Sequence, residues 1–293
     1  MKKTGIVTDS HSGMTHEEAE KLGIKVIPMP FFLNEVCYYE NIEITREEFF
    51  ERVEAGESVS TTQASPQEVM DVWDEALAEC EKILHFPMSS GLSGSCATAQ
   101  ALACEDKYEG RVFVMDLGRI SVPLVCIIYD ALRMIEKGME AEEIRDVLNA
   151  HAGDFDIYVG VDDISFLQRG GRISSATAFI GKMLNIKPML HLKSGLLEKH
   201  KECRGAVKLH KEMIAAIKAE LETTFKEGVD EGRVQVIAAC CAKREIADAW
   251  EKEVREAFPD MKVIYGDLSL GIACHLGPGG IGVGCSMSPK ESV

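Results

Sequence analysis

A loop rich in serine and glycine is the first stretch of this chain that could do chemistry. Residues 88–95 read Met-Ser-Ser-Gly-Leu-Ser-Gly-Ser, between an apolar run, Lys82–Pro87, and an alanine-rich segment, Cys96–Ala103. This order predicts a strand, a polar loop and a helix. Backbone N–H groups at a helix start, the helix dipole and serine hydroxyls together favour an anion. The loop is therefore a candidate binding site for a phosphate or a carboxylate, and an ordinary capped helix start is the alternative.

The same loop lacks the motifs of nucleophilic and nucleotide-binding enzymes. Ser90 stands where the first glycine of the Gly-x-Ser-x-Gly nucleophile elbow would be. No lysine follows Gly94 as a P-loop requires, and Gly91 and Gly94 do not complete Gly-x-Gly-x-x-Gly. No His-Glu-x-x-His or Cys-x-x-Cys pattern occurs, so no metal site is predicted. Because the loop is rich in hydrogen-bond donors but has no catalytic motif, we expect it to bind a carboxylate and not to catalyse a reaction of it.

Two further polar segments carry candidate ligand-binding residues. Thr61 and Thr62 precede a helix start at Ser65, and the capping role of that serine does not explain them. His275 stands before Leu-Gly-Pro-Gly-Gly, a turn whose backbone N–H groups can form an anion nest. A histidine with a purely structural role is the alternative.

Composition limits the classes of partner. The chain has 293 residues, of which 46% are hydrophobic, and a formal net charge of -16. This acidity argues against nucleic acid and anionic membrane surfaces, although a local pocket can still hold a small anion. The sequence shows no membrane-spanning apolar run and no signal-peptide core. Its ten cysteines lack metal-site spacing, which predicts free thiols in a reducing cytoplasm.

Strands and helices are expected to alternate up to about residue 154. The predicted strands are residues 5–10, 24–33, 82–87 and 111–117. Such alternation is typical of an α/β domain with a doubly wound, mostly parallel sheet. Asp9 and Ser10 end the first of these strands, where ligands bind open α/β sheets. A simple Asx turn is the alternative for this pair.

The pattern changes beyond residue 154. Residues 186–200 predict an antiparallel hairpin, and residues 206–225 predict a long helix. Three short strands are expected at 262–265, 268–275 and 281–287. The prediction is therefore an N-terminal α/β domain, residues 1–154, and a C-terminal α+β domain, residues 155–293.

Six segments together resemble the DegV family and span essentially the whole chain. They are Gly5–Ser10, Thr61–Pro66, Ser89–Ser95, Phe166–Ile173, Ile186–Pro188 and His275–Gly279. The resemblance implies a bacterial, cytoplasmic fatty-acid-binding protein whose ligand is buried between two domains. It implies one long-chain fatty acid, roughly C16–C18, in an apolar tunnel where each buried CH₂ contributes about 0.8 kcal/mol. It also implies a separate kinase subunit that makes acyl phosphate for phospholipid synthesis, so the chain itself is not expected to be an enzyme.

The resemblance also assigns roles to individual residues. Thr61 and Ser93 would donate hydroxyl hydrogen bonds to the fatty-acid carboxylate, and His275 would complete that network. Thr62 and Gly94 would add hydroxyl or backbone donors. Such donors are required because a buried carboxylate without partners costs several kcal/mol.

Other residues are assigned more distant roles. Asp9 and Ser10 would line the site from the first loop. Arg169, in the Arg-Gly-Gly-Arg segment, would serve the head group or an incoming partner. The candidates for the tunnel wall, with ordinary core positions as the alternative, are Phe31, Ile173, Phe179, Ile180, Met183 and Leu190.

Two other functions stay open at this point. One is an enzyme, either a hydrolase that uses Ser93 with His275 or a phosphoryl-transfer protein that uses the glycine-rich loops. The hydrolase requires an Asp or Glu that orients His275. The other is a binder of a different carboxylate or phosphate ligand, such as a nucleotide.

Overall fold

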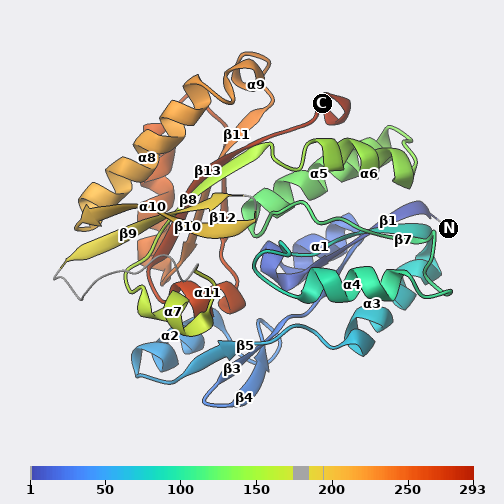
Figure 1. The fold of residues 1–293 in the computed structure, drawn as a ribbon, viewed down its shortest axis with the longest axis horizontal. Helices are drawn as coiled ribbons and strands as arrows, with labels where there is room; N and C mark the ends of the chain where they lie inside the picture. The colour runs from blue at the N-terminus through green and yellow to red at the C-terminus, as the bar shows by residue number, and fades with distance from the viewer. Residues whose placement is uncertain (1, 174–184, 194) are drawn as a thin grey trace. The chain divides into compact units, whose positions relative to one another are not determined.

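The computed structural model describes residues 2–173, 185–193 and 195–293, which form two compact units (Figure 1). Unit 1 comprises Met1–Pro30, Thr62–Asp154 and Ser288–Val293, and unit 2 comprises Phe31–Thr61 and Phe155–Met287. One boundary between the units falls between Asp154 and Phe155. Residues 31–61 group with residues 155–287, and residues 288–293 group with residues 62–154.

Unit 1 is built on a parallel sheet in the strand order β2-β1-β6-β7. Its strands are β1 (Lys2–Asp9), β2 (Ile24–Ile27), β6 (Cys80–Phe86) and β7 (Val112–Val114). Its helices are α1 (His16–Leu22), α3 (Pro66–Glu79), α4 (Ser95–Ala103), α5 (Val122–Glu136) and α6 (Ala141–Ala150), with short 3₁₀ turns η1 (Ser10–Ser12) and η2 (Lys290–Ser292). Ile6 packs into the core with α5 and α6, whereas its neighbour Val7 packs with α3 and α4. Helices thus cover both faces, and the predicted α/β class with a parallel sheet is confirmed.

The strand order of unit 1 reverses between β1 and β6. From β1 the chain passes through α1 to β2 on one side, and from β6 it passes through α4 to β7 on the other. Open α/β sheets bind ligands at such a switch point, outside the carboxyl ends of the strands. The loops that begin at Ser10 and Met88 flank it, so the fold of unit 1 places the Ser89–Ser95 loop at the expected position.

Unit 2 contains a six-stranded mixed sheet in the order β10-β9-β8-β13-β11-β12. Its strands are β8 (Phe155–Gly160), β9 (Ile186–Lys193), β10 (Leu196–Arg204), β11 (Val234–Cys241), β12 (Val263–Asp267) and β13 (Gly280–Met287). Its helices are α2 (Arg46–Glu54), α7 (Ser165–Gly170), α8 (Ala206–Glu222), α9 (Lys226–Asp230), α10 (Arg244–Ala257) and α11 (Leu270–Leu276). The predicted hairpin is confirmed as β9 and β10. Met213 of α8 and Trp250 of α10 pack into one core with this sheet.

A second, three-stranded sheet in unit 2 corrects one prediction. It has the order β4-β3-β5, from β3 (Pro30–Leu33), β4 (Val36–Tyr39) and β5 (Val59–Thr61). The single strand predicted over residues 24–33 was wrong, because β2 and β3 belong to different sheets. Pro28 stands in the break, and proline cannot donate to a strand ladder.

The strand predicted over residues 268–275 was also wrong, because most of it is helix α11. The side chain of Ser269 caps this helix by accepting from the Ile272 N–H at 3.4 Å, and Gly277 ends it with a φ of 75°. An apolar run this short has no periodicity that separates a strand from a buried helix. The correction matters because His275 lies in the last turn of α11.

Other predictions concern thiols, the membrane and the tunnel wall. All ten cysteines are free thiols, as predicted, and only Cys37 and Cys104 are exposed. None of the described helices is long and apolar enough to cross a membrane. Phe31 packs edge-on against Phe49, with ring centroids 5.4 Å apart, and Leu190 is fully buried. Ile173 is half-buried, and the other candidates, Phe179, Ile180 and Met183, lie outside the described residues.

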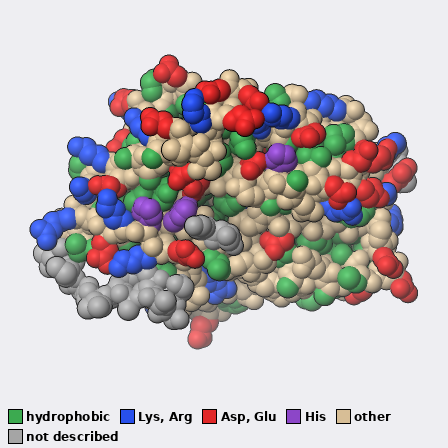
Figure 2. Space-filling model, turned by 45° about the horizontal axis from the view of Figure 1, so that its top comes forward, with side chains coloured by type: hydrophobic (Ala, Val, Ile, Leu, Met, Phe, Trp, Pro, Cys, Tyr) green, Lys and Arg blue, Asp and Glu red, His purple; other side chains and the backbone are tan. Residues whose placement is uncertain are grey.

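The visible surface in Figure 2 carries acidic and basic side chains interspersed with apolar ones. Many of these charges form ion pairs one helical turn apart, such as Lys21 with Glu17 and Lys226 with Asp230. Exposed pairs of this kind contribute little to stability.

One buried titratable side chain stands out in the core of unit 1. His85, on β6, is only 2% exposed and lies edge-on to Trp73 with ring centroids 5.6 Å apart. Neither of its ring nitrogens has a hydrogen-bond partner among the described residues. Burial lowers the pKa of His85 to about 3, so the ring is neutral at physiological pH.

We expect His85→Leu to reduce the loss of stability in acid. Unfolded His85 binds a proton below its ordinary pKa of 6.5, whereas folded His85 resists protonation down to about pH 3. The free energy of unfolding therefore falls as the pH drops through this window. Lowering the pH from 7 to 5 should cost the wild type about 2 kcal/mol more than the variant.

Urea titrations of both proteins at pH 7 and pH 5 measure this difference. Burial raises the pKa of Asp9 to about 6, which gives the opposite pH dependence, but Asp9 is present in both proteins and its effect cancels. Equal acid losses in wild type and variant would contradict a neutral, buried His85.

Candidate functional site

Two of the predicted site residues meet within unit 2. Oγ1 of Thr61, the last residue of β5, lies 2.9 Å from Nε2 of His275, in the last turn of α11. Both side chains are half-buried. The pair joins residues 214 positions apart in the sequence, so it exists only because α11 packs against β5.

The protonation of His275 decides what Thr61 can do. Burial, aided by the positive charge of Arg172, lowers the pKa of His275 to about 4, so the ring is neutral at pH 7. Nδ1 is buried and has no partner among the described residues. A buried N–H without an acceptor is rarer than a buried acceptor without a donor, which favours the tautomer protonated at Nε2. His275 then donates to Thr61, and the hydroxyl proton of Thr61 is left for an anion.

Gly170 makes room for the His275 ring. A Cβ atom on Gly170 would lie 2.1 Å from Nδ1 of His275, which is far inside contact distance. Gly170 ends α7, so only a residue without a side chain allows α7 to pack this closely against the ring. The glycine pair was visible in the sequence, but its contact with His275 was not.

Glu40 and Arg46 fix the start of α11. Glu40 Oε2 accepts from the Leu270 N–H at 2.8 Å, and burial raises the pKa of this carboxyl to about 7. Arg46 donates to the carbonyl oxygens of Leu268 at 2.7 Å and Cys240 at 2.9 Å. These contacts hold the helix that carries His275, and no local sequence signal pointed to them.

In unit 1, the Met88–Ser95 loop places Ser93 and Gly94 immediately before α4. Gly94 is the N-cap of α4 and provides no side chain to satisfy the helix N–H groups. Ser93 Oγ accepts from the Ser95 N–H at 3.1 Å, so its own hydroxyl proton remains for a ligand. An uncapped helix start beside a hydroxyl donor is suited to an anion.

Asp9 and Ser10 have structural partners in unit 1. Asp9 accepts from the Met88 N–H at 2.7 Å and the His11 N–H at 2.9 Å, which ties the loop after β6 to the end of β1. Ser10 Oγ accepts from the Met29 N–H at 3.0 Å. These contacts match the Asx-turn alternative. Thr62, which is exposed, donates its N–H to Pro30 O at 3.5 Å.

The two arginines of the Arg-Gly-Gly-Arg segment differ in position. Arg169 is exposed, stacks over the Phe166 ring at 4.6 Å and donates to Ser165 Oγ at 3.2 Å. Arg172 is the one whose charge acts on His275, and it donates to Gly170 O at 2.6 Å. The sequence prediction named Arg169; the structure brings Arg172 to the histidine.

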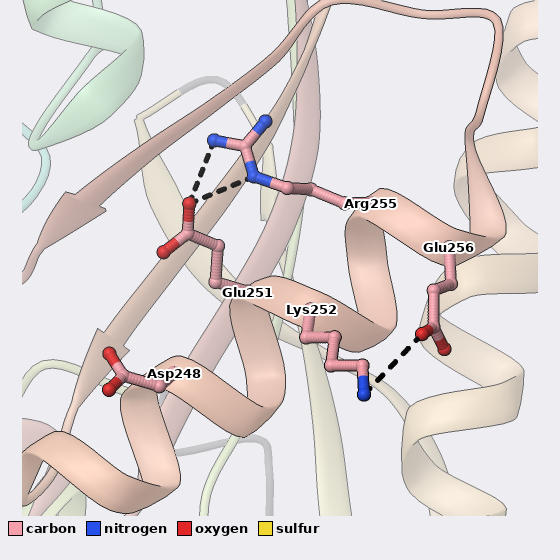
Figure 3. Close-up of a pocket in the computed structure, with 5 residues that line it drawn as sticks. All are labelled: Asp248, Glu251, Lys252, Arg255 and Glu256. Carbon is pink, nitrogen blue, oxygen red and sulfur yellow. Dashed lines mark hydrogen bonds and ion pairs between the residues drawn. The ribbon is translucent and has the colours of Figure 1, made fainter.

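A charged hollow on α10 is not a competing candidate for the anion site. Figure 3 shows a hollow on α10 lined by charged side chains that pair with one another, Arg255 with Glu251 at 2.7 Å and Lys252 with Glu256 at 3.8 Å. These are pairs one turn apart on a solvated helix. No cluster of three or more His, Cys, Asp or Glu side chains in the described part of the chain could hold a metal ion.

The chain is similar to known proteins over nearly its whole length. A family model described as an uncharacterised protein of the DegV family matches residues 3–287. A DegV domain-containing protein of Caldanaerobacter subterraneus subsp. tengcongensis is 28% identical over 97% of this chain and 98% of its own length. A fatty-acid-binding DegV family protein from Thermus thermophilus is 30% identical, with a TM-score of 0.86, over 97% of this chain and 99% of that one. A stearic-acid-binding protein from Eubacterium ventriosum is 25% identical, with a TM-score of 0.85, over 98% and 99%.

We expect Gly170→Ala to destabilise the protein by about 1–3 kcal/mol, since the His275 ring must move away from the new methyl group. This outweighs the gain of up to about 1 kcal/mol that alanine brings to a helix. Urea unfolding measures the change. Gly153→Ala is the matched control, because a Cβ atom there meets nothing within 4 Å. Adding His275→Ala should relieve the strain; a Gly170→Ala protein as stable as wild type would contradict the contact.

Proposed function

The chain belongs to the DegV family, and from that premise we propose that it binds a single long-chain fatty acid. The carboxylate accepts hydrogen bonds from the hydroxyls of Thr61 and Ser93, with Thr62 and Gly94 as further donors, and His275 orients Thr61. The observation that carries this proposal is the bond between His275 and Thr61, which leaves one hydroxyl proton for an anion. Family members from Thermus thermophilus and Bacillus subtilis, described as fatty-acid-binding, support the choice of ligand.

The hydroxyl groups of Thr61 and Ser93 are held in the same way. Thr61 in unit 2 and Ser93 in unit 1 each have an oxygen that interacts with a nitrogen donor, so each keeps its O–H proton for a ligand. Thr61 and Thr62 are consecutive in the chain, the last residue of one segment of unit 2 and the first of a segment of unit 1.

Neutral donors suit a carrier that passes its ligand on. A carboxylate held by hydroxyl and backbone N–H groups keeps its negative charge and its nucleophilic oxygen. We propose that a separate kinase subunit uses this oxygen to attack the γ-phosphoryl group of a nucleoside triphosphate. The new P–O bond forms as the bond to the leaving nucleoside diphosphate breaks, which gives acyl phosphate for phospholipid synthesis. The resemblance of the six sequence segments to the family suggests this step, in which the chain itself would supply binding and orientation.

A hydrolase that uses Ser93 and His275 is the less favoured alternative. It requires a carboxylate at Nδ1 of His275 to hold the base in position. Among the described residues no side chain bonds to that nitrogen, and Gly170 packs against it. Turnover of p-nitrophenyl esters that is lost in Ser93→Ala would restore this alternative.

We expect the purified protein to retain fatty acid from its expression host. Organic extraction followed by mass spectrometry should find close to one long acyl chain per protein, because a buried chain dissociates slowly. A delipidated sample should rebind fatty acid in a calorimetric titration. A protein that carries no acyl chain and rebinds none would contradict the proposed function.

We expect Thr61→Val and His275→Leu each to weaken fatty-acid binding by about 10- to 100-fold, the effect of one hydrogen bond to a charged group. The double variant should lose little more than either single one, because His275 acts through Thr61. Thr61→Ser keeps the hydroxyl and serves as the control. Losses that simply multiply in the double variant would show that the two side chains contact the ligand independently.

A further inference from the structure

Unit 1 contains a small internal cavity, and none of the proposed hydrogen-bond donors to the carboxylate lines it. It has a volume of about 10 Å³, close to the space of one water molecule. Four polar side chains line it, Asp9, His85, Ser95 and Thr98. The other lining residues are apolar: Ile27, Met29, Ala64, Val69 and Pro87.

Two of these polar side chains have unused hydrogen-bonding atoms. Both ring nitrogens of His85 and the Oγ of Ser95 are buried without a partner among the described residues. Thr98 and Asp9 differ, because Thr98 bonds to Gln63 at 3.0 Å and Asp9 accepts two backbone N–H groups. Each unpaired buried group costs about 1–3 kcal/mol, so something that bonds to His85 and Ser95 would stabilise the fold.

The charge state of the cavity limits what can enter. His85 is neutral at physiological pH and therefore offers one N–H donor and one acceptor nitrogen. An anion would meet the Asp9 carboxyl and no cation, because none of the lining residues is Lys or Arg. A neutral hydroxyl donates and accepts at once, which matches the unused atoms of His85 and Ser95.

We propose that His85 and Ser95 form a hydroxyl-binding site in unit 1, which selects fatty acids that carry a hydroxyl group on the chain. This inference rests on the proposed function. The cavity adjoins the head-group loop, since the backbone N–H of Ser95 donates to Ser93 Oγ. Water carries the same chemistry and would fill the site in the ligand-free protein. A chain-borne hydroxyl replaces the bonds of that water, whereas a plain methylene displaces it and leaves His85 and Ser95 unpaired.

The position of Ser95 predicts where the hydroxyl lies on the chain. Two residues span at most about 7 Å, so Ser95 is close to the Ser93 donor. The preferred hydroxyl is therefore in the half of the chain nearest the carboxylate. Met29 in the cavity wall is flexible enough to make room for a substituted chain.

Competition titrations with stearic acid and its hydroxylated isomers test this site in the delipidated protein. Wild type should prefer one isomer hydroxylated near the carboxylate by about tenfold over stearic acid and over isomers hydroxylated near the methyl end. His85→Leu should abolish this preference while it still binds stearic acid. His85→Gln, which keeps one donor and one acceptor, should restore part of the preference, and Ser95→Ala should weaken it.

These measurements distinguish failure of the hydroxyl site from failure of the proposed fatty-acid binding. Because the readout is a ratio of affinities within one protein, a general loss of stability does not imitate it. Equal affinity for stearic acid and every isomer in wild type, or the same preference in wild type and His85→Leu, would overturn the hydroxyl site. Absence of binding to stearic acid itself would instead overturn the fatty-acid proposal.

Discussion

The proposed head-group site of this protein depends on one partly buried hydrogen bond, between Thr61 and His275. Burial keeps the histidine neutral, and the neutral ring can direct its single N–H at the threonine oxygen. The surroundings of the ring serve this arrangement: Gly170 has no side chain to displace it, and Glu40 and Arg46 hold the start of its helix. A small shift of α11 would turn the Thr61 hydroxyl away from any ligand.

Unit 1 reaches a comparable result by a different route. Its parallel sheet reverses strand order between β1 and β6, which opens the carboxyl ends of both strands to a ligand. Asp9 anchors the loop after β6, and that loop ends at a helix start without a side-chain cap. Ser93 is held there through its oxygen, just as Thr61 is held in unit 2. Both units thus have a hydroxyl proton available for the proposed carboxylate.

The interior of unit 1 departs from a purely apolar core at His85. A fatty-acid carrier needs apolar walls, since each buried methylene contributes about 0.8 kcal/mol. A neutral histidine with two unused nitrogens works against such a wall unless a polar group meets it. Core packing does not explain why a histidine lies at this position, whereas the proposed recognition of a hydroxyl would. The selectivity of the protein can thus differ from that of a relative with an apolar residue there.

Local signals in the sequence determined the parallel sheet, the β9–β10 hairpin and the polar loops, because strand periodicity, helix caps and turn residues act over a few positions. They also marked Thr61, the Ser89–Ser95 loop and His275 as candidate ligand-binding positions, and the resemblance to the family assigned their roles as donors. They failed for residues 268–275, where a short apolar run is compatible with either strand or helix, and for residues 24–33, which cross from one sheet to another. The pairing of Thr61 with His275, the fit of Gly170 and the burial of His85 were decided only by the tertiary structure. Each joins residues distant in the sequence, and a side chain's partners and pKa depend on which groups packing brings beside it.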